Sequence, residues 1–173
     1  MRTITLLCCL CASLLAGSAG ARIGSVRFEE LVANSAAIVV ATVSEVEEPT
    51  AERHLIYATA VVQRTIKGSL SGAFRFLAKS DFMCDTGKGV PGETALFFLY
   101  PQGDGNFGIA VAGRGRMPFR IIDGRTYVTV WNGDVILPKD LPTVDGPDPR
   151  YSFIRSVELE NLEALIRKNL SAG

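Results

Sequence analysis

Residues 36–70 read AAIVVATVSEVEEPTAERHLIYATAVVQRTIKGSL, and this stretch establishes the architecture of the chain. Residues 38–41 are apolar at successive positions, which is typical of a strand covered on both faces. From Leu55 onward, small alanines alternate with larger residues. This pattern predicts a second long strand whose alanine face lines a tight interior. A polar loop around Pro49 joins the two strands.

Further strands are predicted along the rest of the chain. The segment 94–100, TALFFLY, is apolar throughout and is expected to be central in the sheet. Asp-Gly at residues 123–124 and Asn-Gly at residues 132–133 are strong hairpin signals, so the strands around them are expected to form a meander. Apolar or alternating patterns mark these strands at residues 73–79, 94–100, 107–112, 117–122, 125–131 and 135–137.

Two helices are expected to flank the strands. Residues 26–35 form the first, with Ser25 as its N-cap and Asn34 as a left-handed end. Ser156 is expected to cap the second near the end of the chain. The apolar faces consist of Phe28, Leu31 and Val32 in the first helix and of Leu159, Leu162, Leu165 and Ile166 in the second.

Short antiparallel strands, a helix at each end and the absence of βαβ alternation predict a mainly β fold. We expect a closed or nearly closed barrel, because closure removes the exposed edges of a sheet. The predicted plan is a signal peptide at residues 1–21, a barrel with an added meander at 22–137, a proline-rich strap at 138–150 and a helix packed on the barrel at 151–173.

The start of the chain has the pattern of a secretory signal peptide. Arg2 is basic, residues 4–15 are apolar, and Ala19, Gly20 and Ala21 end the run with small residues. The run is shorter than the roughly 20 apolar residues that span a bilayer. We therefore expect cleavage after Ala21 and a secreted or periplasmic protein without a membrane anchor.

Charge and motifs exclude several kinds of ligand. Lys plus Arg and Asp plus Glu each number 18, and removal of Arg2 with the leader leaves 17 against 18. Both signs are scattered, so nucleic acid is not expected as a partner. No cofactor is expected either: Gly87, Gly89 and Gly92 match G-x-G-x-x-G, but a strand follows them, whereas a dinucleotide site requires a helix there.

Three segments resemble a known group of proteins. They are LVANSAAIVVATVSEVE, VVQRTIKGSLSGAFRF and a cysteine loop ending in PGETALFFL, within residues 31–112. They are similar to bacterial secreted proteins with an OB-fold like that of tissue inhibitors of metalloproteinases and netrin modules. The resemblance implies a five-stranded OB barrel but no particular function. Those inhibitors chelate the zinc of the protease through an amino-terminal cysteine. Cleavage after Ala21 would make Arg22 the first residue of this chain, so that inhibitory mechanism is not expected here.

Cys84 is the only cysteine outside the predicted leader. It can be a buried small hydrophobe, a disulfide link to a second chain in a dimer, or a reactive thiol. Asp81 and Asp85 flank it, and their negative charge opposes formation of the thiolate, which favours the passive role. His54 is the sole histidine and would be the base if Cys84 were a nucleophile.

Two further groups of residues are candidate binding sites. Asp81, Asp85 and Glu93 could approach a calcium ion, but their spacing matches no ordered ligand series, so a solvated loop is favoured and no metal is expected. On the predicted strand at 125–131, three side chains alternate on one face, which is either an aromatic binding surface or, as we favour, core or a face covered by the strap. These three are Tyr127, Thr129 and Trp131, with Phe119 and Ile121 expected beside them.

The sequence thus predicts an exported, non-catalytic binding or scaffold module, and another extracytoplasmic protein is the expected partner. Two alternatives remain open from the sequence. One is a protease inhibitor that acts through a loop, and the other is an enzyme that uses Cys84 and His54.

Overall fold

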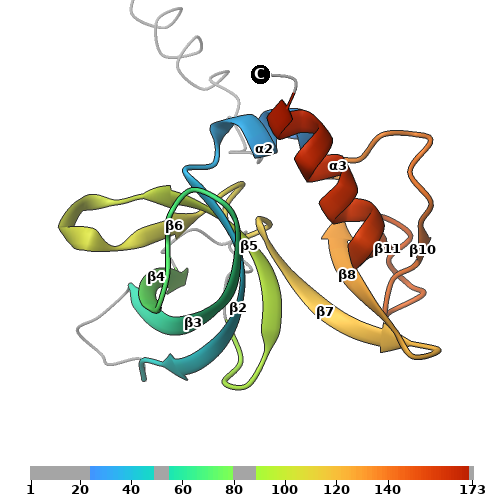
Figure 1. The fold of residues 1–173 in the computed structure, drawn as a ribbon. Helices are drawn as coiled ribbons and strands as arrows, with labels where there is room; N and C mark the ends of the chain where they lie inside the picture. Colours follow the sequence, from blue (N-terminus) through green and yellow to red (C-terminus); the bar gives the residue numbers. More distant parts are fainter. Residues whose placement is uncertain (1–23, 49–54, 80–88, 172–173) are drawn as a thin grey trace, which may run out of the picture.

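The computed structural model describes residues 24–48, 55–79 and 89–171. Five of its strands form a closed barrel (Figure 1). In chain order these strands are β2 (Ala37–Val46), β3 (Ile56–Lys67), β4 (Ala73–Lys79), β5 (Thr94–Pro101) and β6 (Phe107–Ile109).

The strand order of the barrel is that of an OB-fold. Around the barrel the order is β5, β2, β3, β4 and β6, and pairing of β6 with β5 closes the ring. All neighbours are antiparallel except β4 and β6, which run parallel and meet at Phe76 and Phe107. A five-stranded Greek-key barrel with this order is the OB architecture. The predicted mainly β barrel is therefore confirmed.

The interior of the barrel is filled by aromatic rings packed against small residues. The ring centroids of Phe97 lie 5.7 Å from Phe74 and 5.3 Å from Phe76. Ala58 and Ala60 of β3 point into the same space and are at most 2 % exposed, as their alternation predicted. Three register shifts between β2 and β3 bend these strands around the core.

An outer layer covers one side of the barrel. Its elements are α2 (Phe28–Asn34), β7 (Arg116–Ile122), β8 (Arg125–Trp131), β10 (Val144–Asp145), β11 (Ile154–Glu158) and α3 (Leu159–Ser171). The four strands continue the sheet beyond β5 in the order β7, β8, β11, β10, and α3 crosses them on the right of Figure 1. Phe98 of β5 and Ile38 of β2 point outward from the barrel into a second core, which this layer encloses.

An ion pair between Arg64 and Glu163 joins the outer layer to the barrel. Arg64 of β3 donates from its guanidinium to the Glu163 carboxylate of α3, with Nη1 to Oε2 at 2.6 Å. Glu163 is 9 % exposed, and this hydrogen bond raises the pKa of Arg64. Arg167, one turn further along α3, approaches the same carboxylate at 3.6 Å.

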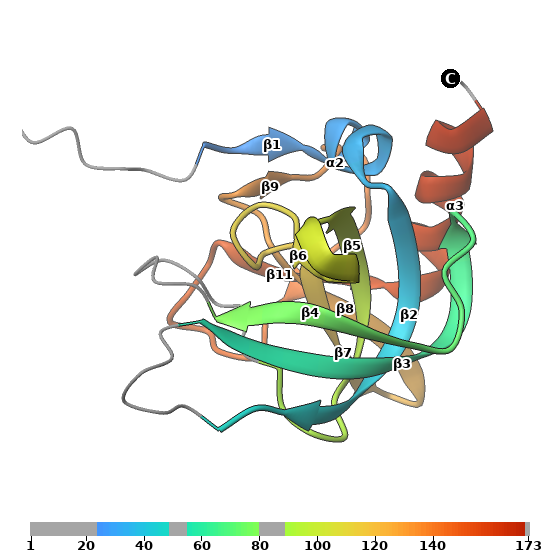
Figure 2. The ribbon, with the colours of Figure 1, turned by 90° about the vertical axis from the view of Figure 1, so that its left-hand side faces the viewer.

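The expected three-stranded meander is wrong. β7 and β8 form the predicted hairpin, but the second neighbour of β8 is β11. Residues Val135–Ile136 form β9, which pairs in parallel with β1 (Val26–Arg27), as Figure 2 shows. Because Val135 and Leu137 are buried in the second core, the chain leaves the sheet after the Asn-Gly turn.

The ends of α2 also differ from the prediction. Its N-cap is Arg27 rather than Ser25, and the Arg27 backbone N–H donates to the Glu30 carboxylate at 3.4 Å. Asn34 is not left-handed, and Ser35 after it is extended, with φ −73° and ψ 130°. The Ser35 hydroxyl instead donates to a carbonyl of the last turn at 2.7 Å, which satisfies an acceptor that the helix leaves open.

Two later boundaries are corrected as well. Ser156 does not cap the second helix: it lies in β11, fully buried, and the helix begins at Leu159. The strand predicted at residues 107–112 ends at Ile109, because Val111 (φ 54°) and Ala112 (φ 46°) turn the chain left-handed. Both errors arose where a short strand meets another element.

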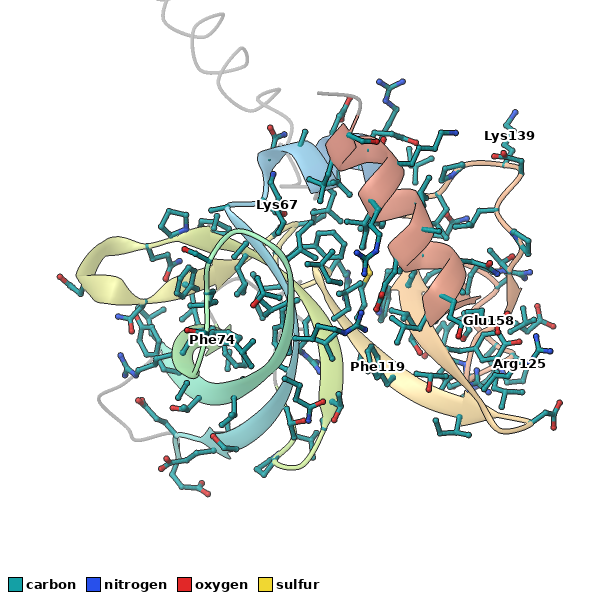
Figure 3. All side chains as sticks on the ribbon, in the orientation of Figure 1. Lys67, Phe74, Phe119, Arg125, Lys139 and Glu158 are labelled. Atoms are coloured by element: carbon teal, nitrogen blue, oxygen red, sulfur yellow. The ribbon has the colours of Figure 1, made fainter. Side chains whose placement is uncertain are left out.

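The Lys-Gly pair at the end of β3 holds α2 in place. The Lys67 ammonium donates to the carbonyl oxygens of Val32 and Ala33, at 2.8 and 2.9 Å, and so satisfies the C-terminal end of α2. Figure 3 shows Lys67 directed towards this helix. Gly68 follows with φ +81°, and a Cβ there would lie 2.8 Å from the Ala36 oxygen.

Candidate functional site

The three predicted binding residues of β8 share one face of the outer sheet. Val128 and Val130 point into the second core, so Tyr127, Thr129 and Trp131 point away from it. All three are half-buried and belong to neither core. Phe153, which follows the strap, packs on the Trp131 ring.

Phe119 and Ile121 of β7 were expected beside Tyr127 and Thr129, but the structure places them on the opposite face of the sheet. Phe119 lies opposite Val128 and packs against the second core, while Arg120 lies opposite Tyr127. A shift of one residue in a strand register exchanges the two faces, and the sequence alone did not specify it. Ile121 is on the Phe119 side and is 68 % exposed.

An aromatic cluster surrounds Trp131. Its ring lies 5.4 Å from that of Phe153, which in turn lies 5.5 Å from that of Tyr151. The Arg114 guanidinium lies 3.7 Å over the Trp131 ring and donates from Nε to Asp134 at 2.7 Å. We call these five residues, Arg114, Trp131, Asp134, Tyr151 and Phe153, the aromatic-arginine patch. Such ring contacts and cation–π contacts each contribute about 0.5–1.5 kcal/mol.

Backbone contacts hold the patch on β8 and β11. The Asn132 N–H donates to the Phe153 oxygen at 2.8 Å, and the Ile154 N–H donates to the Tyr151 oxygen at 2.9 Å. Gly146 lies directly against Ile154, where a Cβ would approach the Ile154 oxygen to 2.6 Å. Since these contacts position both rings, residues 146–154 act as a support for the patch.

An ion pair within this support predicts a pH dependence. The Arg150 guanidinium and the Arg150 backbone N–H both donate to the Asp148 carboxylate. These bonds, the one from the side chain above all, hold the pKa of Asp148 below its ordinary value of 3.8. The contribution of this pair is therefore complete above pH 3.8 and is lost as the pH falls through the lowered pKa. Arg150→Ala is expected to return the Asp148 pKa towards 3.8, as followed by carboxyl ¹³C shifts, and an unchanged titration would contradict this contact.

Tyr127 and Thr129 lie on a more polar part of the same face. Thr129 is paired with Ser156, and Arg120 donates from Nη1 to the Ser156 hydroxyl at 3.3 Å and to the Asp145 oxygen at 3.2 Å. Trp131 therefore belongs to the ring cluster. Thr129 instead lies beside polar groups that Arg120 links by hydrogen bonds.

The remaining predicted site residues have different outcomes. Cys84, Asp81, Asp85 and His54 lie outside the described residues, as does a dimer contact through Cys84. Glu93 is described and forms an ion pair with the Arg116 guanidinium. Within residues 24–48, 55–79 and 89–171, no group of three His, Cys, Asp or Glu side chains is arranged to hold a metal ion.

Arg114, Tyr151 and Phe153 were missed by the sequence reasoning. Arg114 lies in a turn rich in glycine and arginine, and nothing in its spacing indicates a contact with Trp131. Tyr151 and Phe153 are two residues apart, immediately before β11. That period of two is the signal that could have identified them as one face of an extended segment.

The fold and the patch define the class of this protein: a five-stranded OB-type barrel with an outer β layer that bears an exposed aromatic surface. Comparison with models of known protein families finds no match, and comparison with curated proteins finds none either.

Neither helix in the part of the chain that the structure describes is long and apolar enough to cross a membrane.

Proposed function

We propose that this chain is an exported, non-catalytic binding module and that its partner is another extracytoplasmic protein. The observation that supports this is the aromatic-arginine patch. Tyr151 and Phe153 are 44 % and 43 % exposed, although their rings pack on each other and Phe153 also packs on Trp131. Tyr, Trp and Arg are the residues that most often supply the binding energy of protein interfaces.

The arrangement of the rings favours a protein over a sugar or a base. Stacking of a base or sugar requires a free ring face. Here Arg114 covers one face of Trp131, and the Phe153 ring packs against two others, those of Trp131 and Tyr151. A protein partner buries ring edges and faces together, so this packed cluster suits it.

Export and a distant relationship are part of the same proposal. Export rests on the leader pattern of Arg2, the apolar residues 4–15 and the small residues before position 22. The proposed relationship to the bacterial OB proteins that resemble metalloproteinase inhibitors is supported by the strand order of the barrel, which is the one that the resemblance implies.

Alanine variants of the patch test the proposal. Affinity capture from the organism's envelope fraction, with mass spectrometry, would identify the partner, and its affinity would then be measured for each variant. Trp131→Ala and Phe153→Ala are each expected to weaken binding at least about thirtyfold, as hot-spot residues do.

Ile121→Ala is the matched control, because Ile121 is an exposed apolar residue on the other face of the same sheet. It is expected to leave the affinity unchanged. Equal affinities for all three variants and the native protein would exclude the patch as the binding surface.

A further inference from the structure

A cavity of about 300 Å³ opens beside α2, and none of the residues of the aromatic-arginine patch lines it. Its apolar wall comes from Val26, Leu31, Ala110 and Val111. A volume of this size is at the lower end for ligand pockets and suits one long side chain rather than a cofactor.

One wall of the cavity is held in an unusual backbone conformation. Val111 has φ 54°, which is rare for a β-branched residue. The turn is fixed by hydrogen bonds from the Arg114 N–H to the Val111 oxygen at 3.0 Å and from the Gly115 N–H to the Ala110 oxygen at 2.9 Å. The wall is therefore preformed, and backbone strain of this kind is concentrated at binding sites.

The polar groups at the cavity determine which side chain it suits. Among the lining residues the only formal charge is the Glu30 carboxylate, and the uncharged polar residues are Asn34, Ser35 and Tyr100. Glu30 is bonded to Arg27 at 3.2 Å, but the two side chains are 50 % and 69 % exposed. Pairs so exposed contribute at most about 1 kcal/mol, so an incoming cation can replace or share this contact.

The cavity and the aromatic-arginine patch are adjacent. The Val26 N–H donates to the Asp134 oxygen at 2.9 Å, and the Asp134 carboxylate holds Arg114 over Trp131. Arg114 also bonds to the strained turn through Val111. The same short segments thus border both features, so one partner can contact both.

We propose that this cavity receives a basic side chain, lysine or arginine, of the protein that binds the patch. Its methylene stem packs on Val26, Leu31 and Val111, and its cationic head reaches the Glu30 carboxylate. Long basic side chains bury their stems on apolar surface in this way while their charge stays near water. The inference rests on the proposed function, since it assigns chemistry to the partner.

A titration that needs no partner tests the inference. The exported chain, labelled with ¹⁵N, is titrated with Nα-acetyl-lysine amide and, separately, with Nα-acetyl-norleucine amide, which has the same stem without the charge. The amide signals of Val26, Leu31 and Val111 are expected to shift saturably, and the lysine compound is expected to bind at least roughly threefold more tightly.

Two matched variants locate the charge. Glu30→Gln is expected to abolish the preference for lysine over norleucine, while Glu29→Gln, on the same helix but not at the cavity, preserves it. The inference is overturned if these amides do not shift, if the two compounds bind equally to the native protein, or if both variants act alike. The Trp131 and Phe153 variants are tested separately with the captured partner. A negative titration would therefore refute the role of the cavity without refuting the proposed function of the patch.

Discussion

Phe97→Ala is expected to lower the free energy of unfolding by about 3–5 kcal/mol, the cost of deleting a buried phenylalanine ring. Phe97 is fully buried in the barrel, where it contacts the rings of Phe74 and Phe76. These neighbours belong to β4, across the barrel from β5, and cannot close around the space that is left. Urea unfolding followed by circular dichroism measures the change.

Phe153→Ala serves as the control, because it also deletes a phenylalanine ring, but one that lies at the surface. Phe153 is 43 % exposed and contacts two rings, those of Trp131 and Tyr151, so its loss is expected to cost about 1–2 kcal/mol, clearly less than the loss of Phe97. If the two variants were destabilised equally, Phe97 would not lie in a closed, densely packed interior.

Gly68→Ala is expected to cost about 2–3 kcal/mol, more than an ordinary exchange of glycine for alanine. Gly68 has φ +81°, where an L residue is strained by about 1–2 kcal/mol. In addition, its Cβ would lie 2.8 Å from the Ala36 oxygen, so the backbone between β3 and β2 would have to shift. The same urea measurement gives the change.

Gly72→Ala provides the comparison for this effect. Gly72 has φ +72° but open space around the site of a Cβ, so only the conformational strain of about 1–2 kcal/mol is expected, without the added cost of a close contact. Equal losses in the two variants would show that the close approach at Gly68 has no energetic consequence.

Periodicity predicted the body of the fold because each face of β2, β3 and β5 has a distinct environment. Ile38 and Val39 point into different cores, so the run that they begin is apolar at every position. The closure of the barrel was harder to derive from residues alone, because β4 and β6 meet at one pair, Phe76 and Phe107. No local pattern encodes a contact of that kind.

The errors have a common physical cause: tertiary packing overrode a plausible local signal. Asn132 and Gly133 favour a hairpin, but burial of Val135 in the second core draws the following strand to β1. Ser156 is a good helix cap by type, yet its place in β11 is set by pairing with Thr129.

The candidate site was predictable only in part. Trp131 was identified because aromatic residues alternate on its strand. Its contact with Arg114 joins the end of β8 to a turn that lies before β7, and its contact with Phe153 depends on the pairing of β8 with β11. Neither follows from spacing, so the composition of the patch required the structure.

Site-specific photocrosslinking in the producing organism would test whether the patch is a binding surface. A photoreactive phenylalanine analogue is placed at Tyr151 in one variant and at Val61 of β3 in another, two positions that are 44 % and 45 % exposed. We expect irradiation to link the Tyr151 variant to a distinct envelope protein and to leave the Val61 variant unlinked. The absence of a product at Tyr151, or the same product from both positions, would contradict a protein-binding function of this surface.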